Sequence, residues 1–165
     1  MKDSKYEKLV REISNFQMGV AMTSLGVIVP INLYEIIMRT FFNKSLIWIQ
    51  EISILLMVWM IFCGFTKIVY EKKDIKIDLI TDRLNSKIKK MLEIFTHLVM
   101  LVFLLIFSYY GYIYLMKQIG MGTLTSGIPR VLYIFPVVLN SISVTLIYIN
   151  ELIIDFNYFG MRGEA

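Results

Sequence analysis

Long stretches without any charged residue alternate with short, strongly charged segments along this chain. Four stretches lack Asp, Glu, Lys and Arg altogether: residues 13–34, 52–66, 94–116 and 131–150. A helix needs about 20 predominantly apolar residues to cross the hydrocarbon core of a bilayer. The pattern therefore predicts an all-α integral membrane protein, a single membrane domain over residues 1–165. Its four transmembrane helices are predicted at residues 16–38, 46–69, 87–116 and 129–150.

The charged segments also carry a periodic pattern. In residues 1–15, Tyr6, Leu9, Val10 and Ile13 follow helical spacing between basic residues, which predicts an amphipathic helix on the membrane surface ahead of the first span. Residues 70–86 repeat the pattern and predict a second amphipathic surface segment, on the cytoplasmic side. Residues 151–165 are left as a C-terminal tail.

The composition supports a membrane protein and excludes several kinds of chemistry. Hydrophobic residues make up 57% of the chain and charged residues 18%, whereas soluble domains are nearer half and a quarter. With one cysteine, Cys63, and one histidine, His97, the chain can form neither an internal disulfide nor a Cys/His zinc site. We therefore predict no catalytic residues, no bound cofactor and no metal site. The basic N-terminus is typical of a signal peptide, but the apolar run after it is too long, so we expect a retained first helix.

Basic residues are distributed unevenly between the two sides. All of the 17 Lys and Arg residues lie in the N-terminal segment, the middle connection or the tail, except four: Arg39, Lys44, Lys117 and Arg130. The positive-inside rule then places both termini in the cytoplasm. So close to the spans, these basic residues predict contact with anionic membrane lipids rather than with nucleic acid.

Three charged residues flank the first predicted hairpin. Arg39 ends the first span, Glu51 lies in the first turns of the second, and Glu35 precedes Arg39 by four residues. Because an unpaired charge at the edge of the hydrocarbon is unfavourable, we predict an Arg39–Glu51 ion pair with Glu35 as a second partner. The alternative is that each side chain reaches water or headgroups independently. Trp48 and Trp59 are predicted interface anchors.

Two helix faces are candidates for contacts. One stripe of the second span faces lipid or a neighbouring helix of the same chain, or else is a docking face for a partner protein. It comprises Trp48, Ile52, Leu55, Trp59, Phe62 and Thr66. Polar residues of the last span can hydrogen-bond to neighbouring helices: Asn140, Ser141, Ser143 and Thr145.

Three segments together resemble a known family. They are Arg39 followed by Trp48-Ile-Gln-Glu51, Gly64 followed by residues 73–84 with Asp78, and Gly127-Ile-Pro129 followed by Pro136. In order and spacing they are similar to the small, DctQ-type membrane subunit of tripartite ATP-independent periplasmic (TRAP) transporters. The resemblance implies a sodium-driven importer in the inner membrane of a bacterium. Its substrate would be a carboxylate, either a C4-dicarboxylate or a sialic acid.

The same resemblance implies two protein partners. They are a large, elevator-type membrane permease subunit, which carries the sodium and substrate sites, and a periplasmic substrate-binding protein. This chain would then be a scaffold that stabilises the large subunit. The alternatives are a stand-alone, four-helix, proton-coupled exporter with Glu35 as its proton carrier, and a membrane enzyme or electron-transfer anchor, against which the single histidine and cysteine argue.

Overall fold

The chain folds into long α-helices. A computed structural model describes residues 5–71 and 86–162 and gives four helices: α1 (Lys5–Phe42), α2 (Ile47–Tyr70), α4 (Ser86–Lys117) and α5 (Val131–Arg162). All four are long and apolar enough to cross a membrane. The predicted all-α class and the four spans are thereby confirmed. Most of the predicted surface segment 70–86, including Asp78, lies outside the described residues.

α2 and α4 follow the predicted boundaries closely, but α1 and α5, the first and last helices of the chain, are longer than predicted. α1 runs without interruption from Lys5, so no break separates the predicted surface segment 1–15 from the first span. The reason is packing against α5: Val10 is buried beside Val144, and the Tyr6 hydroxyl donates a 2.8 Å hydrogen bond to the carbonyl of Leu146. α5 likewise continues to Arg162, through most of the predicted tail.

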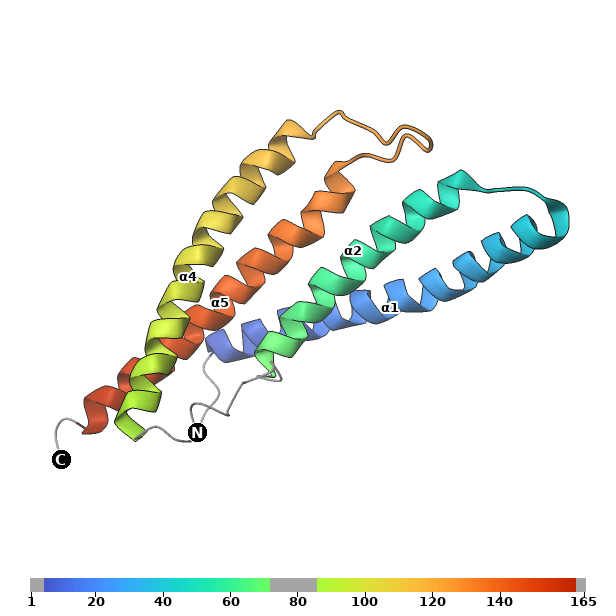
Figure 1. Cartoon of the computed structure of the whole chain (residues 1–165). Coiled ribbons are helices and arrows are strands. Elements are labelled where there is room, and N and C mark those ends of the chain that lie inside the picture. The colour runs from blue at the N-terminus through green and yellow to red at the C-terminus, as the bar shows by residue number, and fades with distance from the viewer. Residues whose placement is uncertain (1–4, 72–85, 163–165) are drawn as a thin grey trace.

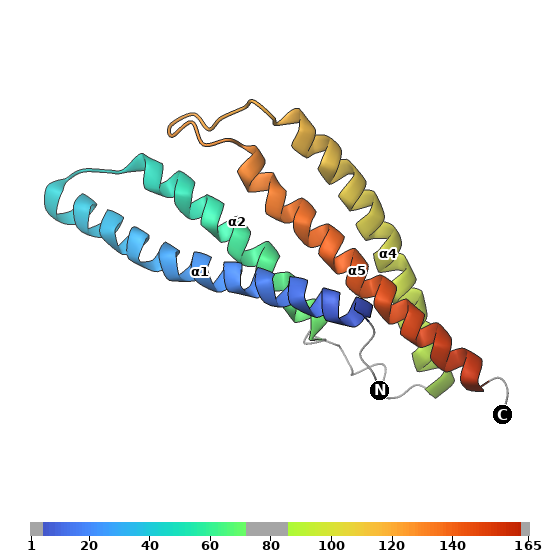
Figure 2. The ribbon, with the colours of Figure 1, turned by 180° about the vertical axis from the view of Figure 1, so that it is seen from behind.

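The four helices form an open layer rather than a closed bundle. α5 packs between α2 and α4, and α1 packs mainly on the outer side of α2, so the spatial order is α1, α2, α5, α4 (Figures 1 and 2). The central α5 has the most buried span and the outer α4 the least. Broad apolar faces therefore remain uncovered by the chain itself, among them much of α4, where Phe103, Leu105 and Ile106 are exposed.

Both hairpin connections lie at the same end of the layer. The short turn between α1 and α2 and the longer loop between α4 and α5 are at one end, and the first residues of α1 and last residues of α5 are at the other (Figure 1). This is the arrangement that four successive crossings require.

Side-chain hydrogen bonds connect α5 to each of the other three helices. The bonded pairs are Asn140 with Thr66 of α2 (2.7 Å), Ser143 with Gln17 of α1 (2.7 Å) and Ser141 with Ser108 of α4 (2.9 Å). The prediction that these polar residues bond to neighbouring helices is confirmed. The fourth, Thr145, instead donates to the Ser141 carbonyl within its own helix (2.7 Å).

Candidate functional site

The carboxylate of Glu51, in the first turns of α2, holds the loop between α4 and α5. Its Oε2 accepts hydrogen bonds from the Thr123 hydroxyl (2.8 Å) and the Ser126 amide (2.9 Å). Its Oε1 accepts a bond from the Thr125 amide (3.2 Å). A charged acceptor forms stronger hydrogen bonds than a neutral one. One acidic side chain therefore fixes the conformation of a four-residue loop segment far away in sequence.

Two glycines allow this loop to fold back on itself. Gly127 has φ +66, in the left-handed region that glycine adopts without strain. At Gly122 an added Cβ would lie 3.0 Å from the carbonyl oxygen of Gly127, so the two backbones approach too closely for a side chain. The Thr123 amide donates to the Ile128 carbonyl (2.9 Å) and completes the turn. The predicted motif position Gly127 is thus explained by backbone conformation.

The entry to α5 is joined to the same point. The Tyr133 hydroxyl donates a 2.9 Å hydrogen bond to the backbone carbonyl of Glu51. Pro129 forms an isolated bridge with Gly122 and lies two residues before α5 begins at Val131, so α5 starts slightly later than the span predicted from residue 129. Its carbonyl accepts a 3.0 Å hydrogen bond from the Leu132 amide at the entry to the helix. Pro136 is buried inside α5.

The predicted Arg39–Glu51 ion pair is not among the contacts of the described residues, and Glu51 has other partners instead. α1 continues one turn beyond Arg39, to Phe42, and the chain reverses only at Asn43, with φ 49. Arg39 therefore stays on the helix and is exposed. Both oxygens of Glu51 meanwhile accept hydrogen bonds from the loop of the second hairpin.

Glu35, the predicted second partner, is buried in α1. It is 8% exposed, and its Oε1 has no hydrogen-bond partner among the residues that the structure describes. Three residues earlier, Asn32 donates to the Ser53 hydroxyl of α2 (3.0 Å), so this face of α1 is directed at α2. Glu35 is thus held at a helix contact, one turn away from the exposed Arg39.

The stripe on α2 faces α5 over its second half. The indole N–H of Trp59 donates to the Leu132 carbonyl (3.0 Å), and its ring lies 5.9 Å from that of Phe135. Thr66 is buried against Asn140. Contact with a neighbouring helix of the same chain therefore accounts for this half, whereas Trp48 is exposed. Gly64 packs on α1, where an added Cβ would be 3.6 Å from that of Ala21.

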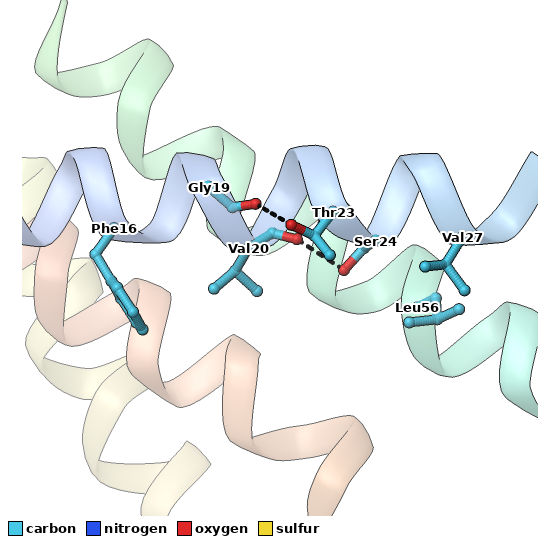
Figure 3. A pocket seen from close by; sticks show the side chains of 7 residues that line it. All are labelled: Phe16, Gly19, Val20, Thr23, Ser24, Val27 and Leu56. Carbon is cyan, nitrogen blue, oxygen red and sulfur yellow. Dashed lines mark hydrogen bonds between the residues drawn. The ribbon is translucent and has the colours of Figure 1, made fainter.

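A shallow groove of about 470 Å³ lies along α1 where it meets α2 (Figure 3). Its lining includes Phe16, Gly19 and Val27 of α1 and Leu56 of α2. Two hydroxyl groups also line it, but both donate to carbonyls of their own helix: Thr23 to Gly19 (2.8 Å) and Ser24 to Val20 (2.9 Å). A Cβ added at Gly19 would meet no atom within 4 Å. The groove is therefore an apolar surface with unfilled space.

The side chains most able to perform chemistry are dispersed. Within residues 5–71 and 86–162, no group of three His, Cys, Asp or Glu residues could hold a metal ion. Cys63 is buried in α2, and the His97 ring packs edge-on against Tyr148 at 5.5 Å. What the arrangement can do is hold helices and a loop in fixed positions and present surfaces to other molecules.

Sequence reasoning missed the residues that bind Glu51. Thr123, Thr125 and Ser126 belong to a polar, glycine-flanked loop that carries no charge, and their partner lies more than 70 residues earlier. The available signal was their position: a cluster of hydroxyl residues in a connection at the same end as Glu51. The sequence instead suggested Arg39 as the partner of Glu51, because Arg39 carries the opposite charge and is closer to Glu51 in sequence.

Two comparisons with known proteins agree with this structure. The family model for the DctQ component of tripartite ATP-independent periplasmic transporters matches residues 28–157. The chain is also similar to the sialic acid TRAP transporter permease protein SiaT of Haemophilus influenzae (strain 86-028NP), with 30% identity over 77 residues. That match covers 47% of this chain but only 12% of SiaT, so the chain corresponds to a small part of the relative's length.

Proposed function

Because the chain belongs to the DctQ component family of tripartite ATP-independent periplasmic transporters, we propose that it is the small scaffold subunit of a sodium-driven importer. It docks to a large, elevator-type permease subunit and holds that subunit's static part in place. A periplasmic binding protein delivers the substrate, which is a carboxylate of the C4-dicarboxylate or sialic acid type. The name of the relative, a sialic acid TRAP transporter permease, favours a sialic acid.

The open helix layer is the observation that carries this proposal. A flat layer with uncovered apolar faces offers a large area to a membrane partner and little enclosed volume for a substrate. A transmembrane helix of the large subunit packs into the groove on α1. Helices in membranes associate where small residues let them approach closely, and Gly19 and Thr23 supply such a position within the groove.

The length of the relative supports a large permease component. The match covers only 12% of SiaT, so most of a permease of that kind consists of parts that this chain does not match. The charge distribution supports an inner-membrane protein with both termini in the cytoplasm. The loop held by Glu51 would then face the periplasm, on the side from which the binding protein approaches.

The test is substitution of Gly19 by leucine, which fills the groove. The chain alone should still fold, because an added Cβ meets nothing at this position and leucine favours helix. We expect the Gly19→Leu variant to lose copurification with its large permease subunit, and sodium-driven carboxylate uptake by reconstituted vesicles to fall with it. The matched control is Val102→Phe, which enlarges an equally accessible apolar residue of α4.

Two results would contradict the proposal. One is full copurification and uptake with Gly19→Leu, which would place the partner elsewhere. The other is sodium-coupled uptake by vesicles that contain this chain alone, which would make it a transporter in its own right.

A further inference from the structure

A second groove lies at the loop end of the layer, between α2 and α4. It encloses about 300 Å³ and is separate from the groove on α1. Its polar lining includes Arg130, Gln118, Tyr114 and Glu51, and its apolar lining includes Ile54 and Ile134. The groove therefore combines one cationic side chain, a carboxylate, an amide and an apolar part.

The amide of Gln118 has an unused acceptor. Its Oε1 is buried and accepts no hydrogen bond from the part of the chain that the structure describes. Leaving a buried acceptor unpaired is unfavourable. The terminal torsion of glutamine is soft, so the amide can turn this oxygen into the groove without moving the helix. Gln118 therefore lacks a hydrogen-bond donor.

The Arg130 guanidinium, by contrast, is a group of hydrogen-bond donors. Its backbone amide is bonded to the Met121 carbonyl (2.9 Å), but within the described ranges its guanidinium takes part in no ion pair. Glu51 lies in the same groove, but its oxygens already accept bonds from the loop. Guanidinium groups bind phosphate in a bidentate manner, so Arg130 is suited to a phosphate group.

The groove sits at the level where a membrane changes from apolar to polar. α4 ends at Lys117, one residue before Gln118, and α5 begins at Val131, one residue after Arg130. Ile54 and Ile134 extend from this level along the spans. Tyr114 and Tyr133 are residues of the type that concentrates at membrane interfaces. A phospholipid has the same arrangement, with a polar headgroup next to apolar acyl chains.

We propose that this groove binds the headgroup of phosphatidylethanolamine. The phosphate pairs with the Arg130 guanidinium, and the primary ammonium donates to Oε1 of Gln118. Phosphatidylcholine has the same charges but no N–H donor, so it leaves the Gln118 oxygen unpaired. Phosphatidylglycerol carries a net negative charge, which is unfavourable beside the Glu51 carboxylate. The choice between these three lipids therefore follows from the Gln118 oxygen and the Glu51 carboxylate, while Arg130 holds the phosphate that all three share.

The experiment measures lipid retention by native mass spectrometry on the purified, delipidated full chain. The chain is mixed with phosphatidylethanolamine, phosphatidylcholine and phosphatidylglycerol in equal amounts. We expect the first lipid to be bound at least about tenfold more than either of the others, the factor for one hydrogen bond to a charged group. Arg130→Gln removes the group that holds the phosphate and should lower retention of phosphatidylethanolamine at least about tenfold. Lys117→Gln, at a basic residue of the same level outside the groove lining, should leave retention unchanged.

A second variant and a soluble competitor keep the test decisive. Gln118→Leu removes the acceptor and should equalise phosphatidylethanolamine and phosphatidylcholine while Arg130 still holds the phosphate. Free phosphoethanolamine should not displace the lipid, because it lacks acyl chains to contact Ile54 and Ile134. Equal retention of the three lipids by the unaltered chain would overturn the proposal. So would unchanged retention of phosphatidylethanolamine by folded Arg130→Gln, with folding checked by circular dichroism, or displacement by free phosphoethanolamine.

Discussion

The hydroxyl of Thr123 donates a 2.8 Å hydrogen bond to Oε2 of Glu51, across 72 residues of sequence. Thr123 is itself fixed, because its hydroxyl oxygen accepts a 3.1 Å bond from the amide of Ile128. These bonds join the first hairpin to the second at the end where both connections lie. The loop that caps the layer is therefore ordered by an acid on another hairpin rather than by its own hydrophobic contacts.

The first prediction concerns the protection of this loop. Glu51→Gln removes the charge and replaces one acceptor oxygen by a donor, which then faces the amide of either Thr125 or Ser126. We expect amide hydrogen exchange at these two residues to accelerate roughly tenfold, as the loss of a charge-assisted hydrogen bond implies. Exchange in the middle of α5 should stay unchanged, because its own ladder of hydrogen bonds is intact. The measurement is exchange detected by mass spectrometry in detergent or nanodiscs.

The control for this prediction is Glu12→Gln. It also removes one acidic charge, but from an exposed position on α1 far from the loop in sequence. Unchanged exchange in Glu51→Gln, or equal acceleration in both variants, would show that the carboxylate does not hold the loop.

The second prediction concerns Arg39. Its side chain is exposed, and the carboxylate of Glu51 is hydrogen-bonded to the loop instead. Arg39→Gln should therefore change the free energy of unfolding by no more than about 0.5 kcal/mol. Exchanging the two charges, with Arg39→Glu and Glu51→Arg together, should fail to restore the loop protection lost in Glu51→Arg alone. Recovery in the exchanged variant would instead support the ion pair that the sequence suggests.

Sequence reasoning predicted the elements that depend on local composition. An uncharged run of 23 residues at 94–116 allows little else than a spanning helix, and the structure places α4 at Ser86–Lys117. The boundaries of α1 and α5 were missed because they depend on packing. Tyr6 and Val10 follow the period of a surface helix, but the same period equally suits a helix that packs on α5.

The partners of Glu51 show a different limit. Two charged residues in adjacent elements suggest an ion pair, and nothing in the spacing indicates that α1 continues past Arg39 before the chain turns. The loop residues that bind Glu51 are uncharged, and their donors are largely backbone amides, which every residue possesses. Only the three-dimensional arrangement identifies which of those amides lie beside the acid.

The third prediction concerns the buried acid Glu35. Its Oε1 is enclosed without a hydrogen-bond partner among the described side chains and backbone, and Glu35 is almost fully buried. Glu35→Met, which is apolar and of similar length, should stabilise the isolated chain by about 1–3 kcal/mol. Unfolding of the purified protein in mixed micelles measures this change, with Glu12→Met as the exposed counterpart. A loss of stability would mean that the carboxylate has a favourable role in the fold.

The last prediction concerns the contact between α2 and α5. The side-chain amide of Asn140 donates to the Thr66 hydroxyl (2.7 Å) and the Phe62 carbonyl (2.6 Å). Hydrogen bonds between membrane helices are worth about 0.6 kcal/mol on average and at most about 1.7 kcal/mol. A double-mutant cycle with Asn140→Leu and Thr66→Val should therefore give a coupling energy in this range, measured from unfolding free energies in mixed micelles.

A matched cycle supplies the comparison for that value. Ile142, on the same helix, is exposed, so Ile142→Val combined with Thr66→Val should be additive within about 0.5 kcal/mol. Additivity in the Asn140 cycle as well would mean that this hydrogen bond does not hold the two helices together. The α2–α5 contact would then depend on apolar packing such as that between Trp59 and Phe135, whose rings lie 5.9 Å apart. Phe135→Ala would in that case destabilise the chain more than Asn140→Leu.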